Sequence, residues 1–281
     1  MYDLIRMIIL FFLTICFGIL ASMVGIGGGA FLVPAFVLFL GMPINEAIGT
    51  SLFTIIFISL SGSLYYLHQK RVDIKTGLIM ESTTIPGAIL GAATTEILPA
   101  IILKIIFFLF LFFSGVKLFT KKDGSSIMKN NPNFFKNSRL KLLNTGLTRK
   151  FVDARGNEWT YYVNIPVLLI SGFFAGFLSG LLGIGGGTLK VPIFTIILGM
   201  PTPIATATAT FMIFFTSLSG GLTHLLLGNV YLEIVAVSAT GAVMGAQIGA
   251  RINVRLSEKY VRKVVGVVLM FVASLMLYSA I

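Results

Sequence analysis

The sequence contains an internal duplication. The run Gly25-Ile26-Gly27-Gly28-Gly29 returns 158 residues later as Gly183-Ile184-Gly185-Gly186-Gly187, and 12 of the 19 positions in 25–43 are identical to those in 183–201. Because a constant offset over such a length is typical of repeated structural units, the two halves of the chain should have the same fold. The same offset relates Ser59-Leu60-Ser61-Gly62 to Ser217-Leu218-Ser219-Gly220.

Both halves contain apolar stretches long enough to cross a membrane. Hydrophobic residues make up 56% of the chain and charged residues 11%, and the mean hydropathy is +0.97. A helix needs about 20 mostly apolar residues to span a hydrocarbon core. The sequence therefore predicts an all-α polytopic membrane protein. Apolar stretches of this kind, with few charges, cover 7–24, 44–67, 97–118, 202–227 and 264–281.

Each half divides into five helical segments, which gives a first repeat over 1–118, a connector over 119–161 and a second repeat over 162–281. The second segment of each half is too short to cross, since about 11 residues of helix reach only about 17 Å. We expect it to form a re-entrant or broken hairpin with the segment before it, tipped by the glycine run. The expected segments are 4–24, 30–40, 44–67, 77–96 and 99–118, and then 162–182, 188–198, 202–227, 233–250 and 257–280.

The basic residues predict that the two repeats are inverted relative to each other. The net charge is +11, but the cations gather in loops, which is typical of membrane topology rather than of a nucleic-acid surface. The basic loop follows the third segment in the first half (Lys70, Arg71) but the fourth segment in the second half (Arg251, Arg255). Because the basic loop follows a different segment in each half, the two repeats are expected to have opposite orientations in the bilayer. The connector 119–161, rich in lysine and arginine, is expected on the cytoplasmic face of the cytoplasmic (inner) membrane, and its residues 151–162 are expected to form a small hairpin that turns at Arg155-Gly156-Asn157.

The glycine runs are candidates for an anion site. Consecutive glycines let backbone N–H groups converge, and the start of the following helix adds unpaired N–H groups and the positive end of its dipole. Alternatively, the glycines serve only for close helix packing in the membrane. The predicted substrate-binding residues are Gly25, Gly27, Gly28, Gly29, Thr50, Gly183, Gly185, Gly186, Gly187, Thr188, Lys190 and Thr208.

Lys190 departs from the symmetry, because its counterpart in the first half is Leu32. A cation at the start of a half-helix inside the membrane is costly without a partner, and a bound anion would neutralise it. If this segment lies nearer the interface, the side chain snorkels instead. Thr50 and Thr208 form a matched pair whose hydroxyls either line the site or bond between helices. Glu81 is expected at the level of the lipid headgroups.

The sequence contains no pattern typical of an enzyme or a metal site. It lacks a Ser/His/Asp set, paired histidine ligands and a nucleotide-binding loop of the Walker type. We therefore expect no catalytic residue, metal or cofactor. The expected partners are a small anion and the lipid bilayer, with proton coupling and a homo-oligomer both compatible with the sequence, and no nucleic acid.

The duplicated layout resembles the sulfite exporter TauE/SafE family. The resemblance rests on the two Gly-Ile-Gly-Gly-Gly runs, the Val-Pro that follows each, the Gly-Met-Pro after each short segment, and Tyr161-Tyr162-Val163-Asn164-Ile165-Pro166. It covers nearly all of the chain outside 119–150. Members are linked to export of sulfite, sulfoacetate and related organosulfur anions, so the resemblance implies a secondary carrier driven by protons or by the membrane potential.

Together these features predict a secondary transporter that exports a small oxyanion, sulfite or a sulfonate, by alternating access. Two alternatives stay open at this point. One is a passive anion channel on the same scaffold. The other is a membrane sensor or assembly partner that acts through the basic connector.

We predict that 119–161 and 251–263 share the cytoplasmic face and that 228–233 lies on the opposite face. Single cysteines in these loops, in a Cys16→Ser background, should react with a membrane-impermeant thiol reagent from opposite sides, because the repeats are inverted. Labelling of 119–161 and 228–233 from the same side would contradict the inversion.

Overall fold

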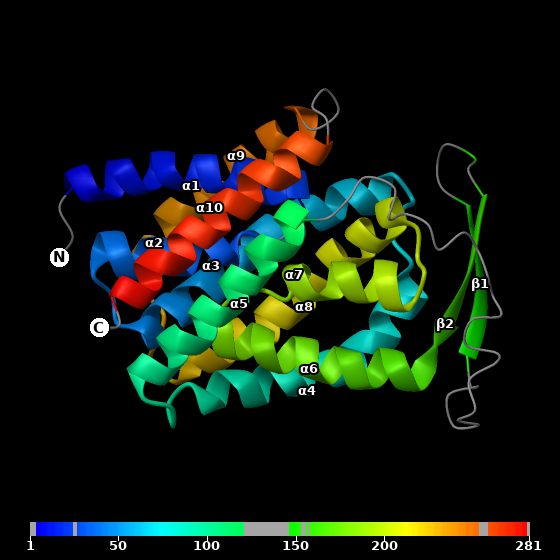
Figure 1. The fold of residues 1–281 in the computed structure, drawn as a ribbon, viewed down its shortest axis with the longest axis horizontal. Coiled ribbons are helices and arrows are strands. Elements are labelled where there is room, and N and C mark those ends of the chain that lie inside the picture. Colours follow the sequence, from blue (N-terminus) through cyan, green and yellow to red (C-terminus); the bar gives the residue numbers. More distant parts are fainter. Residues whose placement is uncertain are drawn as a thin grey trace.

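The computed structural model describes residues 4–24, 27–120, 146–152, 156, 158–252 and 258–279. Helices dominate these ranges, and one β-hairpin stands beside the helix bundle (Figure 1). The elements are α1 (Leu4–Val24), α2 (Gly29–Leu40), α3 (Ile44–His68), α4 (Ile74–Thr94), α5 (Ala100–Thr120), β1 (Gly146–Val152), β2 (Glu158–Asn164), α6 (Ile165–Leu182), α7 (Gly187–Pro192), η2 (Ile193–Ile197), α8 (Thr202–Leu226), α9 (Leu232–Ile252) and α10 (Glu258–Tyr278).

The predicted all-α polytopic class is confirmed. Within the described residues, 6 helices are long and apolar enough to cross a membrane, and they include members of both halves. The short segments of the two halves appear as α2 and as α7 continued by η2, so the order of helices is the same in both halves.

The second short helix widens at its middle. Pro192 lies inside it and has no N–H to donate, and the turns that follow form the π-helix η2. The N–H of Leu198 accordingly bonds to the carbonyl of Ile193, five residues back, at 3.1 Å. The helix ends at Ile197, and Gly199, two residues further on, has φ +63°.

The connector contains the expected hairpin, but the hairpin continues further than the sequence suggests. Strands β1 and β2 pair antiparallel, with Phe151 opposite Trp159 and Gly146 opposite Asn164. The first helix of the second half was expected from residue 162, whereas α6 begins at Ile165. Asn164 decides this boundary, because it ends β2 and its Oδ1 accepts a hydrogen bond from the N–H of Val167 at 3.1 Å, which caps α6. Most of the connector, 121–145, lies outside the described residues.

The two halves exchange helices. The first helix of each half packs along the fourth helix of the other, α1 on α9 and α6 on α4, while α3 packs on α8 and α5 on α10. Glycine makes the α4–α6 approach close, because a Cβ on Gly87 would overlap the Phe173 carbonyl oxygen and one on Gly91 that of Phe177. This is the packing that the Gly-x-x-x-Gly spacing predicts.

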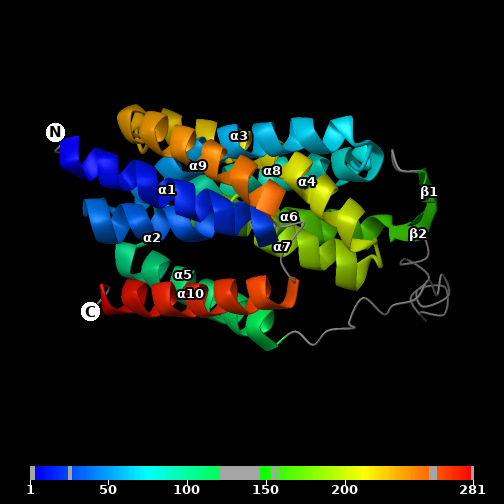
Figure 2. The ribbon, with the colours of Figure 1, turned by 90° about the horizontal axis from the view of Figure 1, so that it is seen from above.

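The loops gather at two ends of the bundle. Figure 2 shows the start of α1 and the end of α10 at one end and the β-hairpin at the other. At the first end, Asn229 Nδ2 donates to Glu96 Oε1 at 2.5 Å and Asn45 Nδ2 donates to the Thr95 carbonyl at 3.2 Å. We call this the termini end and the other the hairpin end.

Asp73 ties the hairpin to the helices. Its carboxylate accepts two hydrogen bonds from Arg149 on β1, at 2.7 and 3.1 Å, and one from the Tyr161 hydroxyl on β2, at 2.6 Å. Thr76 donates to it from the first turn of α4. Burial by itself raises the pKa of Asp73, but the hydrogen bonds from Arg149, Thr76 and Tyr161 outweigh burial and hold the pKa below its ordinary value.

Arg149→Met should loosen the hairpin from α4, because the buried Asp73 carboxylate would lose its cation. Loss of a charge-assisted hydrogen bond costs about 1.5–3 kcal/mol. The fluorescence of Trp159, the single tryptophan of the chain, reports this docking from β2 during thermal unfolding. Lys150→Met, at the neighbouring strand position, is the matched control, and equal transitions in the two variants would contradict the docking role.

Docking of the hairpin, followed by Trp159 fluorescence, should weaken at acidic pH because of Asp73. The folded-state pKa of Asp73 lies below the unfolded value of about 3.9, so its contribution is complete above that value. The contribution is lost as the pH falls through the folded-state pKa. Docking that weakens between about pH 5 and about pH 7 would contradict this assignment.

Candidate substrate-binding site

Both glycine runs form turns that only glycine adopts easily. Gly27 and Gly28 have φ of +85° and +87°, and Gly185 and Gly186 have φ of +71° and +81°. Gly28 and Gly186 each precede a short helix, and their carbonyls accept the first backbone hydrogen bonds of α2 and α7 at 2.9–3.1 Å. A side chain with a Cβ would strain these turns, so the glycine requirement is local.

The two glycine turns touch each other. A Cβ on Gly29 would overlap the carbonyl oxygen of Gly183 and lie 2.6 Å from Cα of Ile184. Ser51 on α3 donates to the same Gly183 carbonyl at 2.9 Å. Ile213 on α8 lies against both turns, 3.2 Å from a Cβ placed on Gly27 and 3.1 Å from one on Gly185. The two α-helical hairpins therefore meet tip to tip.

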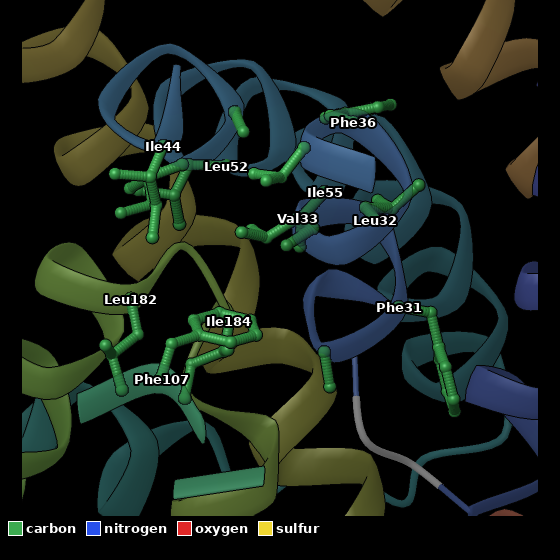
Figure 3. Packing of buried hydrophobic residues seen from close by; sticks show 14 of the residues in the cluster. Phe31, Leu32, Val33, Phe36, Ile44, Leu52, Ile55, Phe107, Leu182 and Ile184 are labelled. Carbon is green, nitrogen blue, oxygen red and sulfur yellow. The ribbon is translucent and has the colours of Figure 1, made fainter. Parts of the chain in front are cut away.

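The first-half side of this junction is apolar. Figure 3 shows Leu32 and Val33 of α2 with Ile55 of α3 in a cluster of buried hydrophobic side chains, near Ile184 of the second turn. Leu32 is completely buried. The position that matches Lys190 therefore provides packing and no charge.

Lys190 is completely buried, at 0% exposure, and has two protein partners. Its Nζ donates to Glu81 Oε1 of α4 at 2.7 Å and to the hydroxyl of Thr216 on α8. Thr216 in turn donates to Glu81 Oε1 at 3.0 Å. A Cβ on Gly186 would lie 3.4 Å from Lys190 Cε, so the end of the lysine side chain lies beside the second glycine turn.

Glu81 is therefore a candidate site residue that the sequence reasoning did not select. It was expected at the level of the headgroups, and the structure shows that it is buried in the bundle, at 2% exposure. Its partner lies 109 residues away in the chain, so no local spacing links the two. Thr216 was missed for the same reason. Together Glu81 and Lys190 keep the charge of the site balanced, since a buried cation is stable only with a partner.

Thr50 and Thr208 lie elsewhere than at the turns. The Thr50 hydroxyl accepts a hydrogen bond from the N–H of Tyr231 at 3.2 Å, and that of Thr208 accepts one from the N–H of Asp73 at 3.0 Å. Tyr231 and Asp73 are themselves 158 residues apart. In each case the hydroxyl binds the loop before the fourth helix of the other repeat. The two loops lie at opposite ends of the bundle.

The remaining predicted residues lie at different places. Gly25 falls outside the described residues. Gly187 begins α7 and is buried. The Thr188 hydroxyl is buried, has no hydrogen-bond partner in the part of the chain that the structure describes, and lines a groove between α5 and α7–η2.

A small cavity leads from the hairpin end toward the first glycine turn. Its volume is about 70 Å³, more than one water molecule requires. It reaches Gly27, and Gln247 Nε2 donates across it to the Ser61 hydroxyl at 2.7 Å. Its polar side chains, besides these two, are Ser22, Ser59, Tyr65, Tyr66 and Thr210. Within the described ranges, no group of three His, Cys, Asp or Glu residues could hold a metal ion.

Lys190→Met and Glu81→Gln should each destabilise the protein more than the two changes together. Either single change leaves one buried charge without its partner, at a cost of about 3–5 kcal/mol, whereas the double change removes both charges. Thermal unfolding of the purified protein in detergent measures the difference. Additive single effects would contradict the ion pair, and Leu32→Met, the matched position in the first half, is the control.

Comparison with known proteins identifies the family. The chain matches the family model for the sulfite exporter TauE/SafE over residues 10–276. It is 34% identical over 230 residues to the probable membrane transporter protein YunE of Bacillus subtilis, covering 79% of this chain and 80% of that protein. It is 28% identical over 233 residues to a probable membrane transporter protein of Haemophilus influenzae, covering 82% of this chain and 79% of that protein.

A third relative is more distant, the sulfite exporter TauE/SafE family protein 6 of Arabidopsis thaliana, which is 23% identical over 288 residues and covers 76% of this chain and 67% of that protein. No solved structure matches the chain. The match to the family model over nearly the whole chain agrees with the paired glycine turns and the duplicated helix order, and this membrane protein belongs to the sulfite exporter TauE/SafE family.

Proposed function

We propose that this membrane protein exports a small oxyanion, sulfite or an organosulfur anion such as a sulfonate, across the cytoplasmic membrane by alternating access. The observation that carries the proposal is Lys190, a completely buried cation beside two glycine turns that touch. The sulfur chemistry of the anion rests on the family and on the names of the relatives.

The anion competes with Glu81 for Lys190. In the structure the Glu81 carboxylate forms an ion pair with the Lys190 ammonium group. It therefore takes the position that an anionic oxygen of the substrate would have. An arriving oxyanion displaces this carboxylate, and the free carboxylate is then costly unless it keeps Thr216 as a donor or takes up a proton. Proton coupling, if the carrier uses it, therefore has its natural place at Glu81.

The glycine turns supply uncharged donors to the same anion. The first N–H groups of a helix have no partner within the helix, and positive-φ glycines let them approach a ligand closely. The turns before α2 and α7 meet at one place from opposite halves, so each half contributes donors to a shared site. That arrangement suits a carrier in which two repeats move around a central site.

The cavity favours a carrier over a channel. It approaches Gly27 from the hairpin end, and Lys190 and Glu81 beyond it are buried. We assign the hairpin end to the cytoplasm, because β1 and β2 lie there and belong to a connector whose sequence is rich in lysine and arginine. The site is then accessible from one side at a time, which is what coupled transport requires.

Lys190→Met/Glu81→Gln should weaken anion binding while keeping the fold, since it removes the cation together with its buried counter-charge. The loss of a charge-assisted contact costs about 1.5–3 kcal/mol, which corresponds to roughly 10- to 150-fold in affinity. Lys190→Arg should retain part of the affinity, because the charge remains with a different shape. Leu32→Met is the matched control.

The measurement is uptake into proteoliposomes of sulfite, thiosulfate, sulfate, sulfoacetate and a carboxylate, with size-exclusion profiles as the check on folding. An unchanged affinity in the double variant would refute the role of Lys190. Flux that only ever follows the anion gradient, whatever proton gradient or potential is imposed, would indicate the channel.

A further inference from the structure

Residues that line the cavity at the hairpin end have counterparts in the second half that are buried. Adding 158 to the number of each first-half residue that lines the cavity gives its match in the second half. We call those matched residues that are buried, which lie toward the termini end, the second set. The matched pairs are Ala21 with Ser179, Gly27 with Gly185, Ile58 with Thr216, Ser59 with Ser217, Gly62 with Gly220, and Tyr66 with His224.

Close packing seals the second set. A Cβ on Gly220 would lie 3.1 Å from Leu52 Cδ1, 3.8 Å from Gly180 Cα and 3.9 Å from Ala88 Cβ. His224 Nε2 lies 3.3 Å from the Gly180 carbonyl, and a Cβ on Gly49 would lie 2.8 Å from Cβ and 3.1 Å from Cγ of His224. Tyr66, which matches His224, is only half-buried. The matched positions that line a cavity in the first half are thus buried in the second half.

The sealed region nevertheless contains polar atoms without partners. Among the described residues, Ser179 Oγ, Ser217 Oγ and His224 Nδ1 are buried and have no hydrogen-bond partner. All three residues are 0% exposed, and all three match residues that line the open cavity. A buried polar group without a partner costs about 1–3 kcal/mol, so this region is unfavourable for hydroxyl and imidazole groups as long as it stays closed.

The second set is also more polar than the first. Alanine, isoleucine and tyrosine at three positions of the open cavity are replaced by Ser179, Thr216 and His224. Ser179 Oγ and Ser217 Oγ lie 3.5 and 3.1 Å from Cβ atoms placed on Gly186 and Gly185, so both face the second glycine turn. Thr216 is bonded to Lys190 and Glu81. Opening of this region would therefore expose the buried ion pair.

We propose that Ser179, Thr216, Ser217 and His224 line a second, closed cavity that opens at the termini end and admits the oxyanion to Lys190. This inference rests on the proposed function, and it adds the route on the opposite side and the residues that form it. When the cavity opens, the unpaired hydroxyls and imidazole nitrogen gain water or anion oxygens as partners. When it closes, the open cavity at Gly27 gives access instead.

Cysteine accessibility tests the proposal with a matched pair of sites. Ser59→Cys and Ser217→Cys, each in a Cys16→Ser background, occupy equivalent positions in the two halves. A membrane-impermeant maleimide is applied to right-side-out and inside-out vesicles that contain the full chain. Ser59→Cys should react from the side of the hairpin end, and Ser217→Cys from the opposite side. Ser179→Cys is the second reporter in case Ser217→Cys does not fold.

Sulfoacetate serves as the anion in this experiment, because sulfite itself would consume the maleimide. A ligand shifts an equilibrium only by its preference for one state, so sulfoacetate should change the two labelling rates in opposite directions. The second cavity would be overturned if Ser217→Cys and Ser179→Cys stayed unreactive from both sides. It would also be overturned if they reacted from the same side as Ser59→Cys. Reaction from the opposite side without any effect of sulfoacetate would support the cavity and count against the proposed substrate class.

Discussion

The contact between the two glycine turns is the constraint on which the rest of the structure depends. Gly29 has no side chain, so the first turn rests directly on the backbone of Gly183 and Ile184. Irregular backbone within a membrane-spanning bundle is tolerated only where it is enclosed by protein or lines a cavity. The helices α3 and α8 provide that enclosure through Ser51 and Ile213.

The position of the turns decides where the charge can lie. Because α7 starts at the centre of the bundle, a lysine in its first turn is buried at once, and the only stable arrangement includes a counter-charge. Glu81 provides it from α4, which packs on α6 and α8. The ion pair and the Thr216 hydroxyl thus connect α4 of the first half with α7 and α8 of the second, while Leu32, the residue that matches Lys190, contributes no charge. Similar backbones in the two halves carry chemically different interiors.

Much of the fold follows from the sequence, since apolar length and helix-breaking residues act locally. The short helices, the glycine turns and the hairpin at Phe151–Trp159 were all expected, and each depends on residues that are close in the chain. The boundary at Asn164 was missed, because one side chain serves both the end of β2 and the cap of α6. The threonine pair was identified as a matched feature, but the partners of the hydroxyls, Tyr231 and Asp73, lie in distant loops.

The sequence by itself determined the membrane class, the duplication and the glycine turns, because hydropathy, a constant offset and positive φ are properties of short stretches of chain. Only the tertiary structure decided that Lys190 pairs with Glu81 and that Asp73 joins Arg149 and Tyr161. It also decided that residues around Gly27 line a cavity while the matched residues Ser179, Thr216, Ser217 and His224 are completely buried. These contacts join residues far apart in the chain, and their energies depend on burial, which no local pattern records.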